Sequence, residues 1–195
     1  MADLSVGERV LTVDSDGHLR YDDVIAFVHR QPQLLTSFTV IATVAGRRLV
    51  ATGDHLIFTS SDQSASFGDA AKPSFVAHLH LGNDSVYVTS SGSKRLAVSM
   101  VTNVTMVTGR GVFAPLTSTG TIVVDGVAAS CYALVSSHRV AHWSMAPVRL
   151  AAGACSWWTC QQNTAALVDG VHWYAQFLRR LTEFLLPDSD LWFTR

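Results

Sequence analysis

The stretch that decides the fold is residues 111–133, GVFAPLTSTGTIVVDGVAASCYA, in which short runs of Val, Ile, Thr and Ala alternate with turn residues. Runs of this length, bounded by Gly, Asp and Ser, are typical of β-strands. We expect consecutive strands over 112–116, 121–124 and 128–135. The last of them carries Cys131 in an apolar surrounding.

An earlier stretch, residues 46–56 (GRRLVATGDHL), has the same order of features as residues 120–131. Each begins with glycine and runs through a strand and a glycine-containing turn. Each then reaches a reactive side chain, which is His55 in the first stretch and Cys131 in the second. The repetition predicts two related halves that face each other across a shared site.

The remainder of residues 1–137 reads as further short strands in a segment rich in Val, Thr, Ser and Ala. We expect them over 9–13, 24–29, 37–44, 48–51, 56–59, 74–79, 86–89 and 96–107. Gln31 and Pro32 are expected to end the second strand, and residues 60–73 read as a surface loop. Strands at this spacing predict an all-β sandwich or barrel rather than βαβ units.

Composition excludes several classes of function. The chain has 195 residues, 48% of them apolar, and a formal net charge of −1, so it is too apolar for disorder and offers no basic surface to nucleic acid. Three cysteines form neither a disulfide framework nor a zinc motif, and His78 and His80, on one face of an expected strand, lack a third ligand. We expect no metal and no cofactor. We also expect neither a membrane-spanning helix nor a signal peptide in this sequence.

The character of the sequence changes near residue 138, because all five tryptophans lie after residue 142. We therefore divide the chain into a β-rich body, residues 1–137, and a short, mainly helical tail, residues 138–195. Apolar residues recur at helical spacing over 174–185, and another helix is expected over about 138–152, interrupted by Pro147. The tail reads either as helices packed on the body or as a surface for a flat apolar ligand or a membrane.

Chemistry in the body rests on four residues. Thr52 and His55 stand three residues apart where a strand leads into a turn, so that a hydroxyl and an imidazole can meet at one point. Such a pair can bind an amide carbonyl and protonate its nitrogen as the bond breaks. The spacing is common, and a turn threonine beside a surface histidine fits it as well. Cys131 equally fits a small buried hydrophobe and His29 an edge residue.

Together these stretches resemble the C-terminal autoprocessing domain of hedgehog proteins, in the Hint (hedgehog/intein) superfamily. The resemblance is carried by residues 4–11 (LSVGERVL), 23–30 (DVIAFVHR), 52–56 (TGDHL), 111–133, 141–143 (AHW), 146–150 (APVRL) and 170–174 (GVHWY). They occur in the family's order over nearly the whole chain. The resemblance implies a Hint fold, a flat β module with pseudo-two-fold symmetry, over residues 1–137, and a sterol-recognition tail over residues 138–195.

The resemblance also implies a reaction in two steps. In the family, a cysteine at the first position of the domain attacks the preceding peptide carbonyl, and cholesterol then displaces the sulfur and becomes esterified to the released signalling domain. Thr52 and His55 would assist the first step, His29 stands where the family has a sterol-activating aspartate, and Cys131 resembles a cysteine that exchanges a disulfide with the nucleophile. The implied partners are cholesterol, the signalling domain in cis and a membrane surface, in the secretory pathway. The glycosylation sequons at Asn83 and Asn103 fit that pathway.

Two departures from the family pattern are visible. Family members carry Gly-Cys-Phe a few tens of residues before the Leu-Ser-Val-Gly element, whereas here Met1 stands three residues before it. None of the three cysteines takes that position, so we expect this polypeptide alone to form no thioester. His29 replaces the usual aspartate, although histidine, with a pKa of about 6.5, is also a general base.

Two alternatives stay open. In the first, the chain is a non-catalytic sterol- or membrane-binding β module whose tail binds and whose body is a scaffold. In the second, it is an unrelated hydrolase that uses His55, for which the sequence offers neither a GxSxG motif nor a triad.

Overall fold

The computed structural model describes residues 1–68, 70–133, 138–155, 170–171 and 176, with the backbone alone for 151–155 and 170–171. Its strands are β1 (Arg9–Val13), β2 (Leu19–Thr43), β3 (Arg48–Ala51), β4 (His55–Ser60), β5 (Lys72–Phe75), β6 (Ser85–Thr89), β7 (Leu96–Thr117), β8 (Thr121–Val124), β9 (Val127–Ala133) and β10 (Gly170–Val171). Its helices are the 3₁₀ turn η1 (Val76–His78), α1 (His138–Ser144) and α2 (Ala146–Cys155). The expected all-β fold with helices after residue 137 is confirmed, and the helix expected over 174–185 lies outside the described residues.

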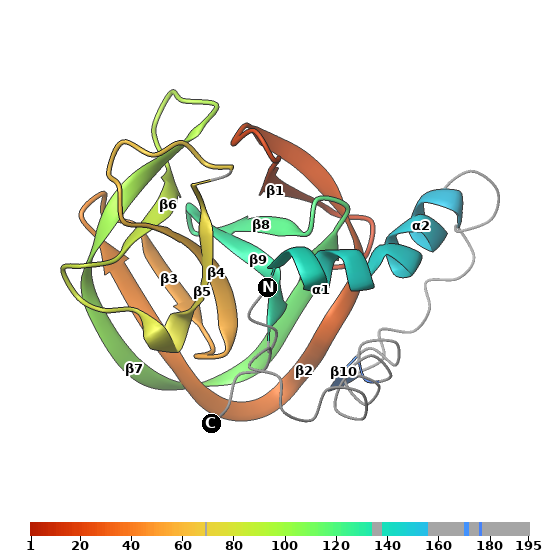
Figure 1. Ribbon diagram of the computed structural model, residues 1–195. Coiled ribbons are helices and arrows are strands. Elements are labelled where there is room, and N and C mark those ends of the chain that lie inside the picture. The colour runs from red at the N-terminus through yellow and green to blue at the C-terminus, as the bar shows by residue number, and fades with distance from the viewer. Residues whose placement is uncertain (69, 134–137, 156–169, 172–175, 177–195) are drawn as a thin grey trace.

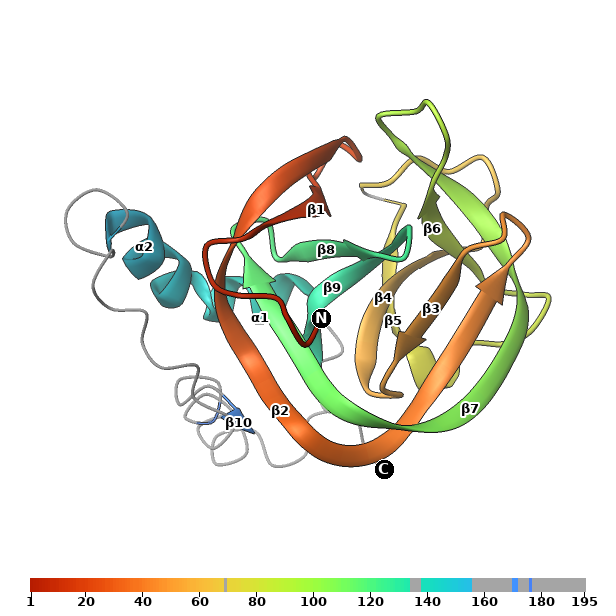
Figure 2. The ribbon, with the colours of Figure 1, turned by 180° about the vertical axis from the view of Figure 1, so that it is seen from behind.

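Two long strands, β2 with 25 residues and β7 with 22, pair antiparallel and form a bent ribbon that surrounds the shorter strands (Figure 1, Figure 2). The prediction that Gln31 and Pro32 end a strand is therefore wrong. The register shifts between Gln31 and Leu35, so a bulge absorbs the proline and the strand continues. Gly111 lies opposite this bulge with φ +92°, and a Cβ there would stand 3.2 Å from the Pro32 carbonyl oxygen.

The repetition seen in the sequence extends over the whole body. Strands β1 to β4 have 5, 25, 4 and 6 residues, and β6 to β9 have 5, 22, 4 and 7, in the same order. The two sets pair antiparallel at three places, which are β2 with β7, β4 with β6 and β4 with β9. In the last of these pairs, His55 lies opposite Ala133 and Ile57 opposite Ala129. The described strands form one sheet, in which β4 and β9 are neighbours in the order β1-β2-β7-β6-β4-β9-β8.

The segment after the Ser/Gly loop differs from its predicted form. A strand was expected over 74–79, but β5 ends at Phe75 and the 3₁₀ turn η1 follows. Val76 and Leu79 are both buried, and a separation of three residues brings them to one side of a 3₁₀ turn. His78 and His80 therefore do not share the face of a strand.

Helix α1 is packed on the body, since Ala141 and Met145 belong to the same apolar core as Ile57 and Leu116. The expected helix over 138–152 is present with a break at Met145, and Pro147 occupies the second position of α2, where no helical partner for its missing N–H is needed. Among the described residues, no helix has the length and apolar character required to cross a membrane.

Candidate functional site

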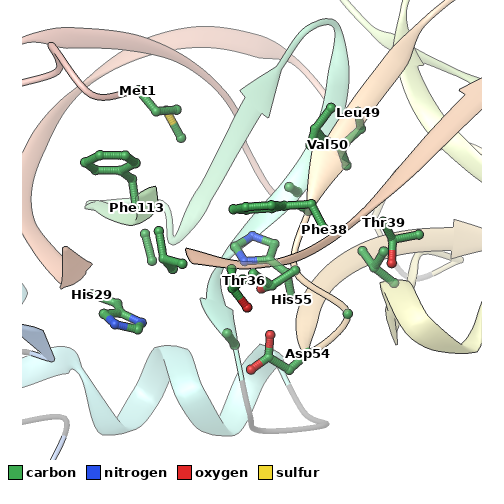
Figure 3. Close-up of a pocket in the computed structure, with 18 of the residues that line it drawn as sticks. Met1, His29, Thr36, Phe38, Thr39, Leu49, Val50, Asp54, His55 and Phe113 are labelled. Atoms are coloured by element: carbon green, nitrogen blue, oxygen red, sulfur yellow. The ribbon is translucent and has the colours of Figure 1, made fainter. Parts of the chain in front are cut away.

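A pocket of about 1130 Å³ opens where the β2–β7 ribbon passes the turn between β3 and β4 (Figure 3). Its lining is mainly apolar and includes Val28, Phe38, Leu49, Met106, Phe113 and Met145. Its polar groups include His29, Thr52, Asp54 and His55, and Met1 at the start of the chain lines it as well. Pockets that are largely apolar with a few polar groups are typical of ligand and active sites.

The turn from Thr52 to His55 connects β3 to β4 and is closed by the His55 amide, which donates to the Thr52 carbonyl oxygen over 3.1 Å. Gly53 allows η1 to pack against this turn. A Cβ there would lie 3.2 Å from that of Ala77, whose amide donates to the Gly53 carbonyl oxygen over 2.9 Å. Thr52 and His55 thus line one pocket.

The half-buried ring of His55 makes one defining hydrogen bond. Its Nε2 lies 2.9 Å from the carbonyl oxygen of Ser130 on β9. A carbonyl only accepts, so Nε2 carries the proton. Burial lowers the pKa of His55, while the Ser130 carbonyl and the charge of Asp54 oppose that shift. At neutral pH the ring is therefore neutral, with the lone pair on Nδ1.

His29 on β2 is half-buried and lines the same pocket. Its Nε2 lies 3.1 Å from Oε1 of the Gln31 side chain, an amide oxygen that only accepts, so Nε2 is the donor of this hydrogen bond. Its backbone stands between Ala114 of β7 and Val171 of β10. The structure thus brings His29, Thr52 and His55 together, while their chemical roles stay predictions.

Cys131, the fourth predicted site residue, is not part of the pocket lining. It is buried in β9, with its Sγ 3.6 Å from Oγ1 of Thr117. Burial is the main cause that raises the pKa of the thiol to about 11, so the sulfur is protonated at neutral pH. Exchange of a disulfide with an incoming cysteine therefore stays a prediction.

Sequence reasoning missed a polar cluster behind His55 that joins α1 and α2 to β9. The Ser130 hydroxyl lies 2.9 Å from Nδ1 of His138, and the Tyr132 hydroxyl lies 3.0 Å from Nδ1 of His142. Arg149 of α2 donates to the Tyr132 hydroxyl over 3.3 Å and to the His142 carbonyl. The two imidazole rings are stacked, with 5.8 Å between centroids. A signal was present, because histidines four residues apart share one helix face.

The exposed turn between β1 and β2 has the only group of side chains in the described part of the chain that could hold a metal ion. Asp14, Asp16 and His18 offer ligand atoms within 4.8 Å of one another. The Asp14 carboxylate already accepts the amides of Asp16 and His18, over 3.0 and 2.9 Å. These hydrogen bonds explain Asp14 as a residue that stabilises the turn.

Known proteins are similar to this chain over most of its length. Residues 1–187 match the Hint module family. The chain is 35% identical to Protein hedgehog of Drosophila yakuba over 97% of its own length and 42% of the fly protein. It is 38% identical to the Indian hedgehog protein of Gallus gallus, over 96% of the chain and 44% of that protein. The chain thus spans less than half the length of these relatives.

Two solved structures share the fold. A variant of the Ssp DnaB mini-intein matches with a TM-score of 0.50 and 9% identity, covering 64% of this chain and 74% of the intein. The KlbA intein precursor from Methanococcus jannaschii matches with a TM-score of 0.50 and 14% identity, covering 62% of each chain. At such low identity the likeness concerns the fold alone.

Stability is expected to depend on pH through the helix cluster. Desolvation and the positive charge of Arg149 lower the pKa of both His138 and His142 to about 4, against about 6.5 in an unfolded chain. The unfolded state then binds more protons between these values, so the free energy of unfolding falls as pH drops from about 6.5 to about 4. Urea denaturation at a series of pH values measures this.

The double variant His138→Asn, His142→Asn provides the comparison. It should lose less stability across the same pH range, although His55 and the carboxylates still titrate. If the free energy of unfolding depends on pH in the same way in the unaltered chain and in the double variant, His138 and His142 are not buried in their neutral form.

Proposed function

The chain belongs to the Hint family, and we propose that within this family it is the autoprocessing domain of a hedgehog-type precursor. The observation that carries the proposal is that His29, Thr52 and His55 line one pocket together with Met1. Figure 3 shows Met1, His29 and His55 in this pocket. A segment that precedes residue 1 in a precursor would enter the body at this pocket. Similarity to hedgehog proteins over 97% of the chain supports the assignment.

In the proposed first step, a cysteine of the preceding segment attacks the carbonyl carbon of the peptide bond before it. A C–S bond forms, the C–N bond breaks and a thioester results. His55 accepts the thiol proton at Nδ1 and returns it to the departing amine, because its Nε2 is already bonded to Ser130. Thr52 donates its hydroxyl to the carbonyl oxygen, on which negative charge develops.

In the proposed second step, the hydroxyl oxygen of cholesterol attacks the thioester carbonyl. A C–O bond forms, the C–S bond breaks, and the thiolate leaves and regains a proton. His29 accepts the hydroxyl proton at Nδ1, since its Nε2 is bonded to Gln31. The apolar lining favours a hydrocarbon ring system, because burying apolar surface stabilises by about 25 cal/mol per Å².

The proposal also covers the partner, the product and the cellular compartment of the reaction. The partner in cis is the signalling domain of the precursor, and the product is that domain carrying a sterol ester. Maturation takes place in the secretory pathway, in keeping with the exposed positions of Asn83 and Asn103 within their sequons.

A precursor assay tests the first step. A reporter protein and a segment with the Gly-Cys-Phe pattern of the family are placed before residues 1–195, and dithiothreitol is added to cleave the thioester. We expect release of the reporter. Thr52→Val should slow it by about 10²-fold, the effect of losing one oxyanion donor, and His55→Ala by about 10²–10⁴-fold, the effect of losing a general acid–base.

Thr102→Val and His80→Ala are matched controls, because both residues are exposed and neither lines the pocket. Both should release the reporter at the unaltered rate. The proposal fails if the unaltered precursor releases nothing, or if Thr52→Val and His55→Ala are as fast as the controls.

A second candidate function, membrane binding by the tail, is favoured by the apolar surface of α1 and α2. Val140, Trp143 and Leu150 are 50%, 80% and 73% exposed, although all three are large and apolar. Exposed apolar side chains grouped on short helices are typical of contacts with a membrane interface. This function is compatible with autoprocessing, since cholesterol is a membrane lipid.

Co-sedimentation of residues 1–195 with phosphatidylcholine vesicles containing cholesterol tests the membrane contact. Trp143→Ser should weaken binding about tenfold, because it removes a large apolar group from the interface. Val44→Ser alters a residue that is 65% exposed on a turn of the body and should leave binding unchanged. Equal binding by the two variants, or none by the unaltered chain, would argue against this role.

A further inference from the structure

Strand β9 carries an enlarged bulge opposite His55. Between the paired positions His55–Ala133 and Ile57–Ala129, one residue stands on β4 and three stand on β9, which are Ser130, Cys131 and Tyr132. Residues in a bulge leave the regular ladder and turn their polar groups elsewhere, and bulges are frequent beside active sites. The bulge allows the Ser130 carbonyl to accept the His55 Nε2 proton.

The Ser130 side chain, fully buried, closes the bulge from within. Its Oγ accepts the amide of Tyr132 over 3.0 Å. The same oxygen lies 2.9 Å from Nδ1 of His138. The buried hydroxyl also has one proton to donate, and of its two contacts in the described part of the chain only His138 Nδ1 can accept it, so we assign the hydroxyl proton to His138 Nδ1.

His138 is itself held firmly in place. Its ring stands edge-on to Phe58, with 5.1 Å between centroids, and is tilted against Tyr132 at 5.5 Å. It stacks on His142, which is bonded to the Tyr132 hydroxyl. The acceptor for Ser130 is therefore an imidazole fixed on several sides, at the first residue of α1.

We propose that His138 is a positioning residue for His55: by accepting the Ser130 hydroxyl it holds the β9 bulge in the shape that presents the Ser130 carbonyl to His55 Nε2. His55 then has one tautomer, and its Nδ1 is left for the reacting groups. The inference rests on the proposed function for its importance to the reaction, but the tautomer of His55 can be measured without it. Residue 138 begins the tail in the sequence-based division, so the tail contributes to the site of the body.

Loss of the acceptor has a defined consequence. Without His138 Nδ1, the buried Ser130 hydroxyl loses the acceptor of its proton, and an unsatisfied buried donor is unfavourable. The Ser130 side chain then turns about χ1 to reach another acceptor, Oγ leaves the Tyr132 amide, and the bulge relaxes. His55 loses its fixed acceptor, so that both neutral tautomers become populated.

NMR of the 195-residue chain labelled with ¹⁵N-histidine tests the proposal directly, because two-bond ¹H–¹⁵N correlations distinguish the tautomers. In the unaltered chain at pH 7, His55 should be protonated on Nε2 alone. His138→Leu keeps an apolar volume against Phe58 and Tyr132 but has no acceptor, and it should give a mixture of tautomers. His138→Asn places Oδ1 where Nδ1 was, and it should restore the single tautomer.

The precursor assay gives the second readout. His138→Leu should slow reporter release by about tenfold or more, since an imidazole in the wrong tautomer is a poor acid–base, and His138→Asn should recover most of the rate. His80→Asn is the control on an exposed histidine. Circular dichroism establishes that each variant folds, and His138→Ala replaces His138→Leu if the latter does not.

The NMR experiment and the precursor assay together distinguish a failure of the positioning role from a failure of the proposed function. If the unaltered precursor releases nothing, the proposed function is wrong, and the NMR spectra still decide the positioning role. If His55 has one Nε2–H tautomer in every folded variant, His138 does not position it, whatever the rates. The proposal is likewise overturned if the His138→Asn variant keeps the single Nε2–H tautomer of His55 but releases the reporter slowly.

Discussion

The hydrogen bond from His55 Nε2 to the Ser130 carbonyl is the contact on which the rest of the site depends. It crosses from β4 to β9, one of the strand pairs that join the two repeated halves of the body. The first half supplies the donor, His55, at the end of a turn. The second half supplies the acceptor, the Ser130 carbonyl, in the bulge of β9. The repeated architecture therefore produces a site whose two sides are not alike, with an imidazole on one and its acceptor on the other.

The pocket around this contact combines a large apolar lining with few polar groups. Burial favours the neutral form of the His55 ring. Which nitrogen of an imidazole is engaged as the donor is decided by its hydrogen-bond partner. Ser130 decides this for His55 and Gln31 for His29, so that both rings keep Nδ1 as the basic nitrogen. One apolar pocket can thus contain two bases for two successive steps, with the chain's first residue beside them.

Sequence reasoning located the elements whose limits are local and missed those that depend on distant partners. Strands β1, β3 and β8 have the predicted bounds, because turn residues end them at both sides. The continuity of β2 through Pro32 was missed, since it requires a bulge and Gly111 on the opposite strand. His29, Thr52 and His55 were singled out with the help of the family resemblance rather than by spacing alone. His138 was missed because its role arises only when α1 lies against β9.

The measurement that bears most directly on the central claim, one pocket for both steps, is the intact mass of the fragment released from the precursor in the presence of cholesterol. With His29 in place, we expect a fragment heavier by one esterified sterol, and His29→Ala should yield none of it. A sterol ester formed equally well by His29→Ala, or only a free carboxylate from the unaltered precursor, would contradict the account.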